Sequence, residues 1–158
     1  MEDNIIEIVK ACYAKLASAG SDETAIQTLS EDFRLIAGSK EVDRNGFIAL
    51  LKVVYAAIPD LTHVLSDIQV RGEVVQLTDT PVGTFTSAWD GSSLGLPVIS
   101  PNGSPFLMAP TKWEITVRNG KITRWHDVTI PSVKSGISGF LKALGPQVPV
   151  QRPVSFPL

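Results

Sequence analysis

The chain has 158 residues and a formal net charge of −2, and 44% of its residues are hydrophobic and 19% charged. This composition is typical of one globular domain with one core, and it excludes an intrinsically disordered chain. Acidic and basic residues are mixed along the sequence, so no basic block could neutralise a run of phosphates, and we expect no nucleic-acid partner. Cys12 is the only cysteine, which excludes an intrachain disulfide and a cysteine-based zinc site.

The apolar runs are too short to span a bilayer, and the run over residues 47–58 is interrupted by Lys52. The first residues, MEDNIIEIVK, begin with acids, whereas a secretory signal begins with positive charge followed by an apolar segment. We therefore expect a soluble cytoplasmic protein without a membrane partner.

Helical periodicity dominates the first third of the chain. Apolar residues recur every three or four positions over residues 3–19, which predicts an amphipathic helix. Gly20 ends this helix, and a second, shorter one is predicted over residues 21–29. A short strand over residues 33–36 precedes a third helix, residues 44–57, which Asp43 caps.

After Pro59 the apolar period changes from helical to alternating. Strands are predicted over residues 61–70 and 73–80, and a further strand over 82–89 follows a bulge or bend at 81–83. Residues 90–110 form a long connection rich in glycine and proline. The predicted strands over residues 111–117 and 121–130 form a hairpin across the turn Arg118-Asn119-Gly120.

The C-terminal part has weaker signals. The pattern of residues 132–144 predicts a helix, which Gly136 and Gly139 weaken. Residues 146–158 are predicted to form a proline-rich extended tail, which we expect to lie against the body of the domain or against a partner subunit. Helices followed by antiparallel strands indicate an α+β fold. We expect a single domain over residues 1–145, a cone in which three N-terminal helices cover a curved, mixed or antiparallel sheet and enclose a small-molecule pocket.

Five stretches of the sequence carry a family resemblance: SEDFRL from Ser30, VDRNGFIALL from Val42, AIPDL from Ala57, GTF from Gly83 and RNGKITRW from Arg118. Together they resemble the SnoaL-like polyketide cyclases, a branch of the nuclear transport factor 2-like superfamily with a cystatin-like fold. The resemblance implies a cone-shaped α+β barrel, often a homodimer, with a pocket for a small molecule and no cofactor. The superfamily contains cyclases, isomerases, hydrolases and plain binding domains, so fold alone does not fix the function.

The segment Trp125-His126-Asp127 supplies the first candidate site. Side chains alternate across a strand, so Trp125 and Asp127 share one face and His126 lies on the other. Burial of Trp125 would bring Asp127 into the cone, where desolvation raises a carboxyl pKa toward the range useful for acid–base catalysis. In the cyclases, an aspartate near the end of this strand is the acid–base group, which the resemblance places at Asp127. The alternative is an aspartate at a strand end that bonds a turn or faces solvent.

The spacing departs from the family pattern. Many members have their aspartate four residues after the tryptophan, where this chain has Thr129. The Trp-x-Asp spacing resembles limonene epoxide hydrolase instead. That enzyme has an Arg-x-Asp in an earlier strand, whereas this chain has Leu77-Thr78-Asp79, which lacks the arginine.

Asp79 and Tyr13 are the assisting candidates. Asp79 shares a strand face with Val75 and Leu77, and two carboxylates in one pocket would raise the pKa of one of them; alternatively, Asp79 caps the bend before Pro81. Tyr13 lies beside the apolar stripe of the first helix. In the related steroid isomerases, a tyrosine on a corresponding helix donates a hydrogen bond to an oxyanion; core packing is the alternative role here.

Neither histidine belongs to a metal-binding pattern, so we expect no metal. His63 lies early in a strand, at the mouth of the cone or in water, and His126 is expected at the surface or at an interface. The residues expected to contact a ligand are Phe33, Tyr55, His63, Trp89, Met108, Trp113 and Trp125. Phe106 and Met108, at the end of the long connection, could instead close over a ligand as a lid.

These observations favour a cofactor-independent acid–base enzyme of cyclase, isomerase or hydrolase type that acts on an apolar substrate. Asp127 would be the acid–base group, with Asp79 and Tyr13 assisting it. The alternatives are a non-catalytic protein that binds a small apolar ligand, and a dimeric scaffold of the same fold. An enzyme needs a carboxylate with a polar partner near the ligand, whereas a binding protein needs only apolar walls.

Overall fold

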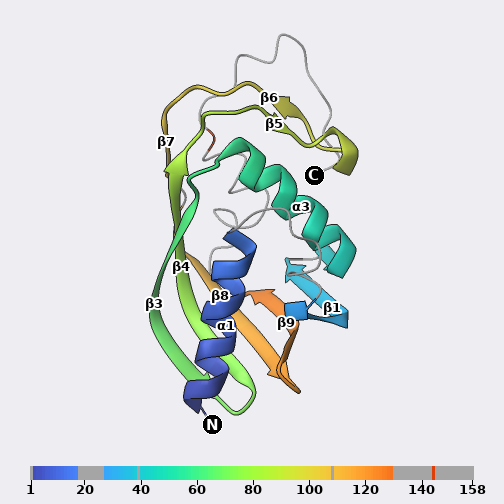
Figure 1. Cartoon of the computed structure of the whole chain (residues 1–158), viewed down its shortest axis with the longest axis vertical. Coiled ribbons are helices and arrows are strands. Elements are labelled where there is room, and N and C mark those ends of the chain that lie inside the picture. Colours follow the sequence, from blue (N-terminus) through green and yellow to red (C-terminus); the bar gives the residue numbers. More distant parts are fainter. Residues whose placement is uncertain (1, 18–26, 39, 108, 130–143, 145–158) are drawn as a thin grey trace.

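The computed structural model describes residues 2–17, 27–38, 40–107, 109–129 and 144. Within these residues two α-helices and one long curved sheet form the framework (Figure 1). In chain order the elements are α1 (Glu2–Ala17), β1 (Leu29–Ala37), β2 (Lys40–Asp43), α3 (Arg44–Ala57), β3 (Thr62–Arg71), β4 (Val74–Thr84), β5 (Trp89–Asp90), the 3₁₀-helix η1 (Ser92–Leu94), β6 (Val98–Ile99), β7 (Pro105–Leu107), β8 (Thr111–Arg118) and β9 (Lys121–Asp127).

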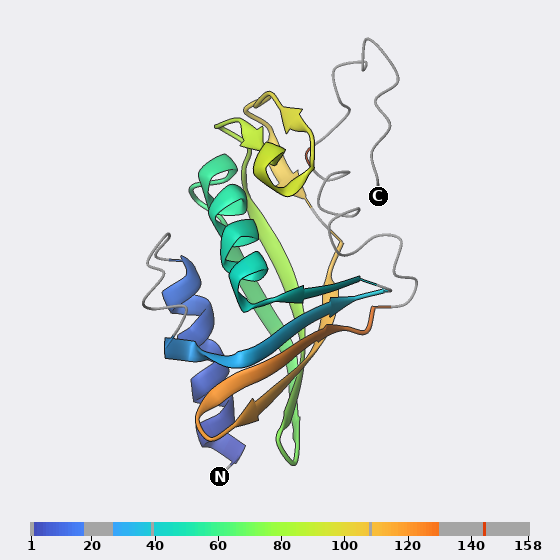
Figure 2. The same cartoon turned by 90° about the vertical axis from the view of Figure 1, so that its right-hand side faces the viewer.

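The main sheet has the strand order β2-β1-β9-β8-β4-β3, and β7 pairs with the end of β4. Every pairing is antiparallel except β1 with β9, which is parallel. The sheet bends strongly, so that β1, β2 and β9 run across the direction of β3 and β4, and α1 and α3 lie together on one side of it (Figures 1 and 2). This arrangement confirms the predicted α+β fold with a curved, mixed sheet.

The two helices form where the apolar periodicity predicts them. α1 buries Val9 and Cys12 of its apolar stripe in the core. α3 spans the predicted residues, and the Asp43 carboxylate accepts a hydrogen bond from the Gly46 N–H at 2.8 Å, as a helix N-cap does.

The expectation of three helices over the sheet is corrected to two within the described residues. The predicted second helix falls mostly on residues 18–26, which lie outside the described part of the chain. Gln27 and Thr28 are helical, but Leu29 is the first residue of β1 and not the end of a helix. Leu29 and Phe33 are fully buried, so packing against the core extends β1 beyond the predicted residues 33–36.

The bulge predicted at residues 81–83 is not present, because β4 continues through Pro81 and its register with β3 and β7 is regular there. Pairing of β4 with β8 ends at Asp79, and pairing with β7 starts at Val82, so the missing N–H of proline falls between the two partners. Gly83 is required two residues later because a Cβ there would collide with Ile58 Cγ2.

The bulge lies instead in β3. Ser66 pairs with Thr78 and Gln69 with Gln76, so Asp67 and Ile68 together lie opposite Leu77 alone. Asp67 takes a left-handed backbone conformation, with φ of 52°, which aspartate tolerates better than most residues. The extra residue changes which side chains of β3 face the helices.

Two core clusters hold the fold together. The first lies between α1, α3 and the sheet and includes Phe33, Phe47 and Trp125. The second packs the C-terminal half of α3 against the segment after β4, and it includes Trp89, Phe106 and Leu144. Both Trp89 and Phe106 have 0% exposure.

The predicted long connection over residues 90–110 is therefore more ordered than expected, because it contains β5, η1, β6 and β7 and supplies part of the second core. Phe106 belongs to that core, which contradicts a lid role for its side chain. Met108 lies outside the described residues, as do the predicted helix over 132–143 and the tail over 146–158. No helix in the described part of the chain is long and apolar enough to cross a membrane.

Candidate functional site

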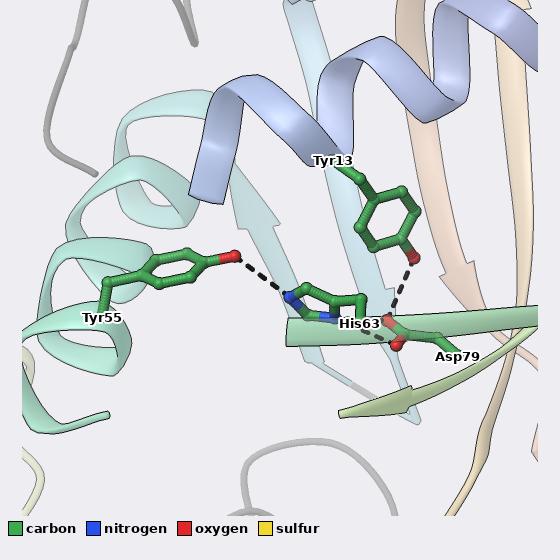
Figure 3. A network of polar contacts seen from close by, with 4 residues as sticks. All are labelled: Tyr13, Tyr55, His63 and Asp79. Atoms are coloured by element: carbon green, nitrogen blue, oxygen red, sulfur yellow. Dashed lines mark hydrogen bonds and ion pairs between the residues drawn. The ribbon is translucent and has the colours of Figure 1, made fainter. Parts of the chain in front are cut away.

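Four polar side chains from four different elements meet on the helix-covered side of the sheet (Figure 3). Tyr13 comes from α1, Tyr55 from α3, His63 from β3 and Asp79 from β4. Hydrogen bonds join them in one chain, in the order Tyr13, Asp79, His63, Tyr55. We call these four residues the tyrosine–histidine–aspartate network.

Asp79 is the centre of the network. The Tyr13 hydroxyl donates to Asp79 Oδ2 at 3.1 Å, and His63 Nδ1 lies 3.0 Å from each carboxylate oxygen. Asp79 is 4% exposed and faces inward with Val75 and Leu77, which are equally buried. The Asp79 side chain therefore bonds Tyr13 and His63 within an uninterrupted strand, instead of capping a bend before Pro81. Hydrogen bonds from two partners satisfy a carboxylate that would otherwise be costly to bury.

His63 uses both ring nitrogens. Its Nδ1 bonds Asp79, and its Nε2 lies 3.0 Å from the Tyr55 hydroxyl. The His63 side chain is 18% exposed, against 6% for the Asp79 side chain, so the imidazole connects the buried carboxylate with the surroundings. The ring also packs against Tyr13, with centroids 5.0 Å apart.

Both tyrosines stay protonated over the physiological range. Burial, followed by the nearby charge of Asp79, raises the pKa of Tyr55 to about 12. The same two causes, in the same order, raise the pKa of Tyr13 well above its usual value. Each hydroxyl is therefore available as a hydrogen-bond donor, and neither is a phenolate base.

The β3 bulge makes this meeting possible. On the turn-proximal side of the bulge, Val70 pairs with Val75 and Arg71 with Val74; beyond the bulge, Leu65 pairs with Asp79 and His63 with Pro81. If all residues of β3 paired one to one with β4, without the bulge, Ser66 would lie opposite Asp79, and His63 would lie on the other face of the sheet. The sequence carries a signal for the bulge, because the apolar residues Leu65 and Ile68 are three positions apart, whereas the inward residues of a regular strand recur every two positions.

Comparison with solved structures finds the same fold at low sequence identity. A protein from Jannaschia sp. CCS1, provisionally assigned as a SnoaL-like polyketide cyclase, matches with a TM-score of 0.66 and 20% identity over 87% of this chain and 93% of its own. IdmH from Streptomyces antibioticus, provisionally assigned as a polyketide cyclase, matches with a TM-score of 0.63 and 22% identity over 78% and 90%. The chain has the fold of the SnoaL-like polyketide cyclases.

An uncharacterised cystatin-fold protein from Novosphingobium aromaticivorans also matches, with a TM-score of 0.57 and 19% identity over 80% of this chain and 97% of its own. No family model matches the sequence, and no curated protein is similar to it. The resemblance to the SnoaL-like cyclases is thus confirmed at the level of the fold. The weaker resemblance to limonene epoxide hydrolase is not shown by these comparisons.

The structure separates Asp127 from the network within this SnoaL-like fold. Trp125 is 3% exposed and stacks edge-on against Tyr13, with ring centroids 5.2 Å apart, so it faces inward as predicted. Asp127 is the last residue of β9, and its Oδ1 accepts a hydrogen bond from the Thr129 N–H at 2.9 Å. This contact matches the strand-end alternative described for Asp127, while its acid–base role stays a prediction.

The residues expected to contact a ligand lie in different surroundings. Phe33 and Trp89 are fully buried in the first and second core clusters. Trp113 is half-buried and packs against Trp125, with ring centroids 6.1 Å apart. Whether any of these residues contacts a ligand stays a prediction. In the described residues, no three His, Cys, Asp or Glu side chains gather as a metal site would require.

Proposed function

We propose that the protein is a cofactor-independent acid–base enzyme that acts on an apolar small molecule, with His63 and Asp79 as its proton-transfer pair. The observation that carries this proposal is the hydrogen bond of 3.0 Å between the buried carboxylate of Asp79 and His63 Nδ1. The His63 side chain is itself only 18% exposed. A carboxylate that holds one ring nitrogen fixes the imidazole tautomer and orientation, and it stabilises the imidazolium that forms on proton uptake.

The network accounts for both protonation states of such a pair. When His63 is neutral, Nδ1–H donates to Asp79 and Nε2 carries the lone pair. When His63 takes up a proton, the positive ring faces the negative carboxylate, and the Tyr13 hydroxyl still donates to Asp79 Oδ2. Two acceptor contacts therefore hold Asp79 in place in either state, which keeps the base oriented without movement of the sheet.

The surroundings favour an apolar substrate. Tyr13 stacks on Trp125, which in turn packs against Phe47 and Trp113, so the network borders a continuous aromatic cluster. An apolar substrate would bury its hydrocarbon surface there, and the few polar groups would orient its reacting atoms. The likeness of fold to proteins provisionally assigned as polyketide cyclases supports the same class of ligand.

The test is hydrogen–deuterium exchange into an apolar ketone. The full-length protein is incubated in D₂O with 2-tetralone, a bicyclic ketone whose α-hydrogens exchange through its enol, and deuterium uptake is followed by mass spectrometry. We expect the wild type to accelerate exchange over the buffer rate. General acid–base groups contribute on the order of 10²–10⁴-fold, so His63→Gln and Asp79→Asn should each remove most of the acceleration.

Asp127→Asn is the matched control, because it makes the same change in a half-buried carboxylate of the sheet that lies outside the network. We expect it to retain most of the wild-type rate. Loss of exchange in Asp127→Asn, with retention in His63→Gln and Asp79→Asn, would move the acid–base role to Asp127. Equal rates in the wild type and all three variants would contradict the proposal and favour a protein that only binds its ligand.

A further inference from the structure

The direction of each hydrogen bond in the network determines what a substrate can reach. Tyr13 and Tyr55 are both neutral, because burial raises the pKa of each, that of Tyr55 to about 12. With Asp79 ionised and His63 neutral, Nδ1–H donates to Asp79, and Nε2 accepts from the Tyr55 hydroxyl at 3.0 Å. In this arrangement, the basic lone pair of His63 is already occupied by Tyr55.

A proton on His63 reverses one bond. In the imidazolium, Nε2–H donates to the Tyr55 oxygen, and the hydrogen of Tyr55 is released to point elsewhere. The Tyr55 hydroxyl is thus an acceptor toward third groups when His63 is neutral and a donor toward them when His63 is cationic. Both arrangements keep the same heavy-atom positions, so the exchange between them needs no movement of α3 or β3.

We propose that Tyr55 is the group of this site that meets the substrate, and that it passes protons between a substrate oxygen and His63 Nε2. This inference rests on the proposed function of the His63–Asp79 pair and says how that pair is reached. His63 Nε2 is not open to a substrate while Tyr55 remains bonded to it. The ligand class is therefore one that presents a hydroxyl, enol or carbonyl oxygen to a single neutral hydroxyl group.

The transfer balances without a further reactant. A substrate O–H gives its proton to the Tyr55 oxygen as the Tyr55 proton moves to Nε2, which leaves a substrate oxyanion and an imidazolium paired with Asp79. In the reverse direction, Nε2–H returns its proton to Tyr55 as Tyr55 protonates the substrate oxygen. The two transfers are concerted, so Tyr55 holds one proton throughout and never becomes a free phenolate.

The first test asks whether Tyr55 occupies Nε2. The chain has only two histidines, so ¹⁵N-histidine labelling gives two imidazoles, which His126→Gln assigns. We expect His63 in the wild type to be the Nδ1–H tautomer with a hydrogen-bonded Nε2. Diethyl pyrocarbonate, which attacks an unprotonated and accessible ring nitrogen, should modify His63 several-fold faster, relative to His126, in Tyr55→Phe than in the wild type.

Tyr13→Phe is the matched control, since it removes the other hydroxyl of the network without uncovering Nε2. We expect it to leave the ratio of His63 to His126 modification within about twofold of the wild type. A ratio that does not rise in Tyr55→Phe, in a variant whose melting temperature shows that it is folded, would overturn the proposal, as would an Nε2–H tautomer in the wild type.

The second test compares the reactivity of His63 toward diethyl pyrocarbonate with the rate of hydrogen–deuterium exchange into 2-tetralone. In this exchange the relay protonates the ketone oxygen from His63 Nε2–H through Tyr55 while solvent water takes the α-hydrogen, so we expect Tyr55→Phe to lose most of the acceleration, on the order of 10²-fold, although its Nε2 becomes more reactive to diethyl pyrocarbonate. A proton relay through Tyr55 predicts that Nε2 becomes more reactive to diethyl pyrocarbonate while the rate of 2-tetralone exchange falls. A merely structural role of Tyr55 would not produce these two opposite changes.

If Tyr55→Phe keeps or exceeds the wild-type rate while His63→Gln is inactive, His63 acts directly and the Tyr55 proposal fails, while the proposed function stands. If His63→Gln is as active as the wild type, the proposed function fails instead, whatever the tautomer.

Discussion

Three weakly acidic side chains near the candidate site are buried and stay neutral. Burial raises the pKa of Cys12 to about 11 and that of Tyr55 to about 12, and burial together with the charge of Asp79 raises the pKa of Tyr13 well above its usual value. In the unfolded chain each group ionises at its usual pH. The folded state therefore binds more protons than the unfolded state at alkaline pH, and stability must fall as pH rises there.

Replacing Tyr55 should weaken this pH dependence. The stability that Tyr55 contributes is complete below its unfolded pKa of about 10 and is lost as pH rises toward its folded pKa of about 12. By pH 11 the loss amounts to about 1.4 kcal/mol for this one group. We expect the free energy of unfolding, measured by urea titration at pH 9 and pH 11, to fall by about that much less in Tyr55→Phe than in the wild type. An identical fall in the two proteins would contradict the buried, neutral state of Tyr55.

The residues of the network were identifiable in part from the sequence. Asp79 could be placed on the inward face because Val75 and Leu77 lie two and four residues before it, and Tyr13 because it adjoins the stripe of its helix. Their contact with each other depends on packing between α1 and β4, which sequence spacing does not fix. Trp125 was correctly predicted to face inward, but the last residue of a strand can turn away, and the Asp127 carboxylate bonds the following turn.

At the scale of elements, a single residue of β3 decides whether the network exists. Asp67 is the extra residue of the bulge, and the register on its two sides differs by one. A slip of one residue turns every later side chain to the other face of a sheet. His63 and Leu65 therefore owe their inward orientation to the bulge at Asp67, although the Asp67 side chain itself is exposed.

Asp67→Val should dismantle the network without removing any of its members, because a β-branched residue strongly disfavours the left-handed conformation that the bulge uses. If all residues of β3 then pair one to one with β4, His63 turns to the outer face and its contact with Asp79 is lost. We expect the His63 imidazole to lose its Nδ1–H tautomer in NMR spectra, and exchange of 2-tetralone to fall as it does in His63→Gln. Asp67→Gly is the matched control, because glycine adopts the same left-handed conformation and preserves the bulge. Retention of the wild-type tautomer in Asp67→Val would contradict this prediction, because the bulge would then not depend on the residue at position 67.

The local sequence pattern predicts the helices and most strands, whereas the prediction errors fall where tertiary contacts determine the secondary structure. α3 begins and ends as predicted because its cap and Pro59 are local signals. β2 and β7 have four and three residues, too few for periodicity, and they form because β1 and β4 offer free edges. The bulge was assigned to the proline of β4, although the change of inward positions in β3 pointed to Asp67.

At the scale of the whole molecule, the outer face of the sheet is the one that lies opposite α1 and α3. Ile36, His126 and Glu114 lie side by side there, since Ile36 pairs with His126 and His126 with Glu114 across β1, β9 and β8. All three are half-buried in the single chain. The resemblance to the SnoaL-like cyclases implies a homodimer, and in that superfamily this face often packs on a second subunit. We propose that the protein dimerises through it.

Light scattering tests the dimer and its surface together. We expect the wild type to have twice the chain mass of 17.0 kDa at micromolar concentration. Ile36→Asp places a charge in the middle of the proposed contact, where desolvating an unpaired carboxylate is costly, so it should shift the protein to the monomer mass. Val98→Asp is the control, because Val98 is 62% exposed in β6 and lies away from this face. A wild-type monomer would contradict the dimer, whereas a dimer that survives Ile36→Asp would place the contact on another surface. Because the network lies on the opposite side of the sheet, Ile36→Asp should keep its exchange activity, and the two properties are then separable.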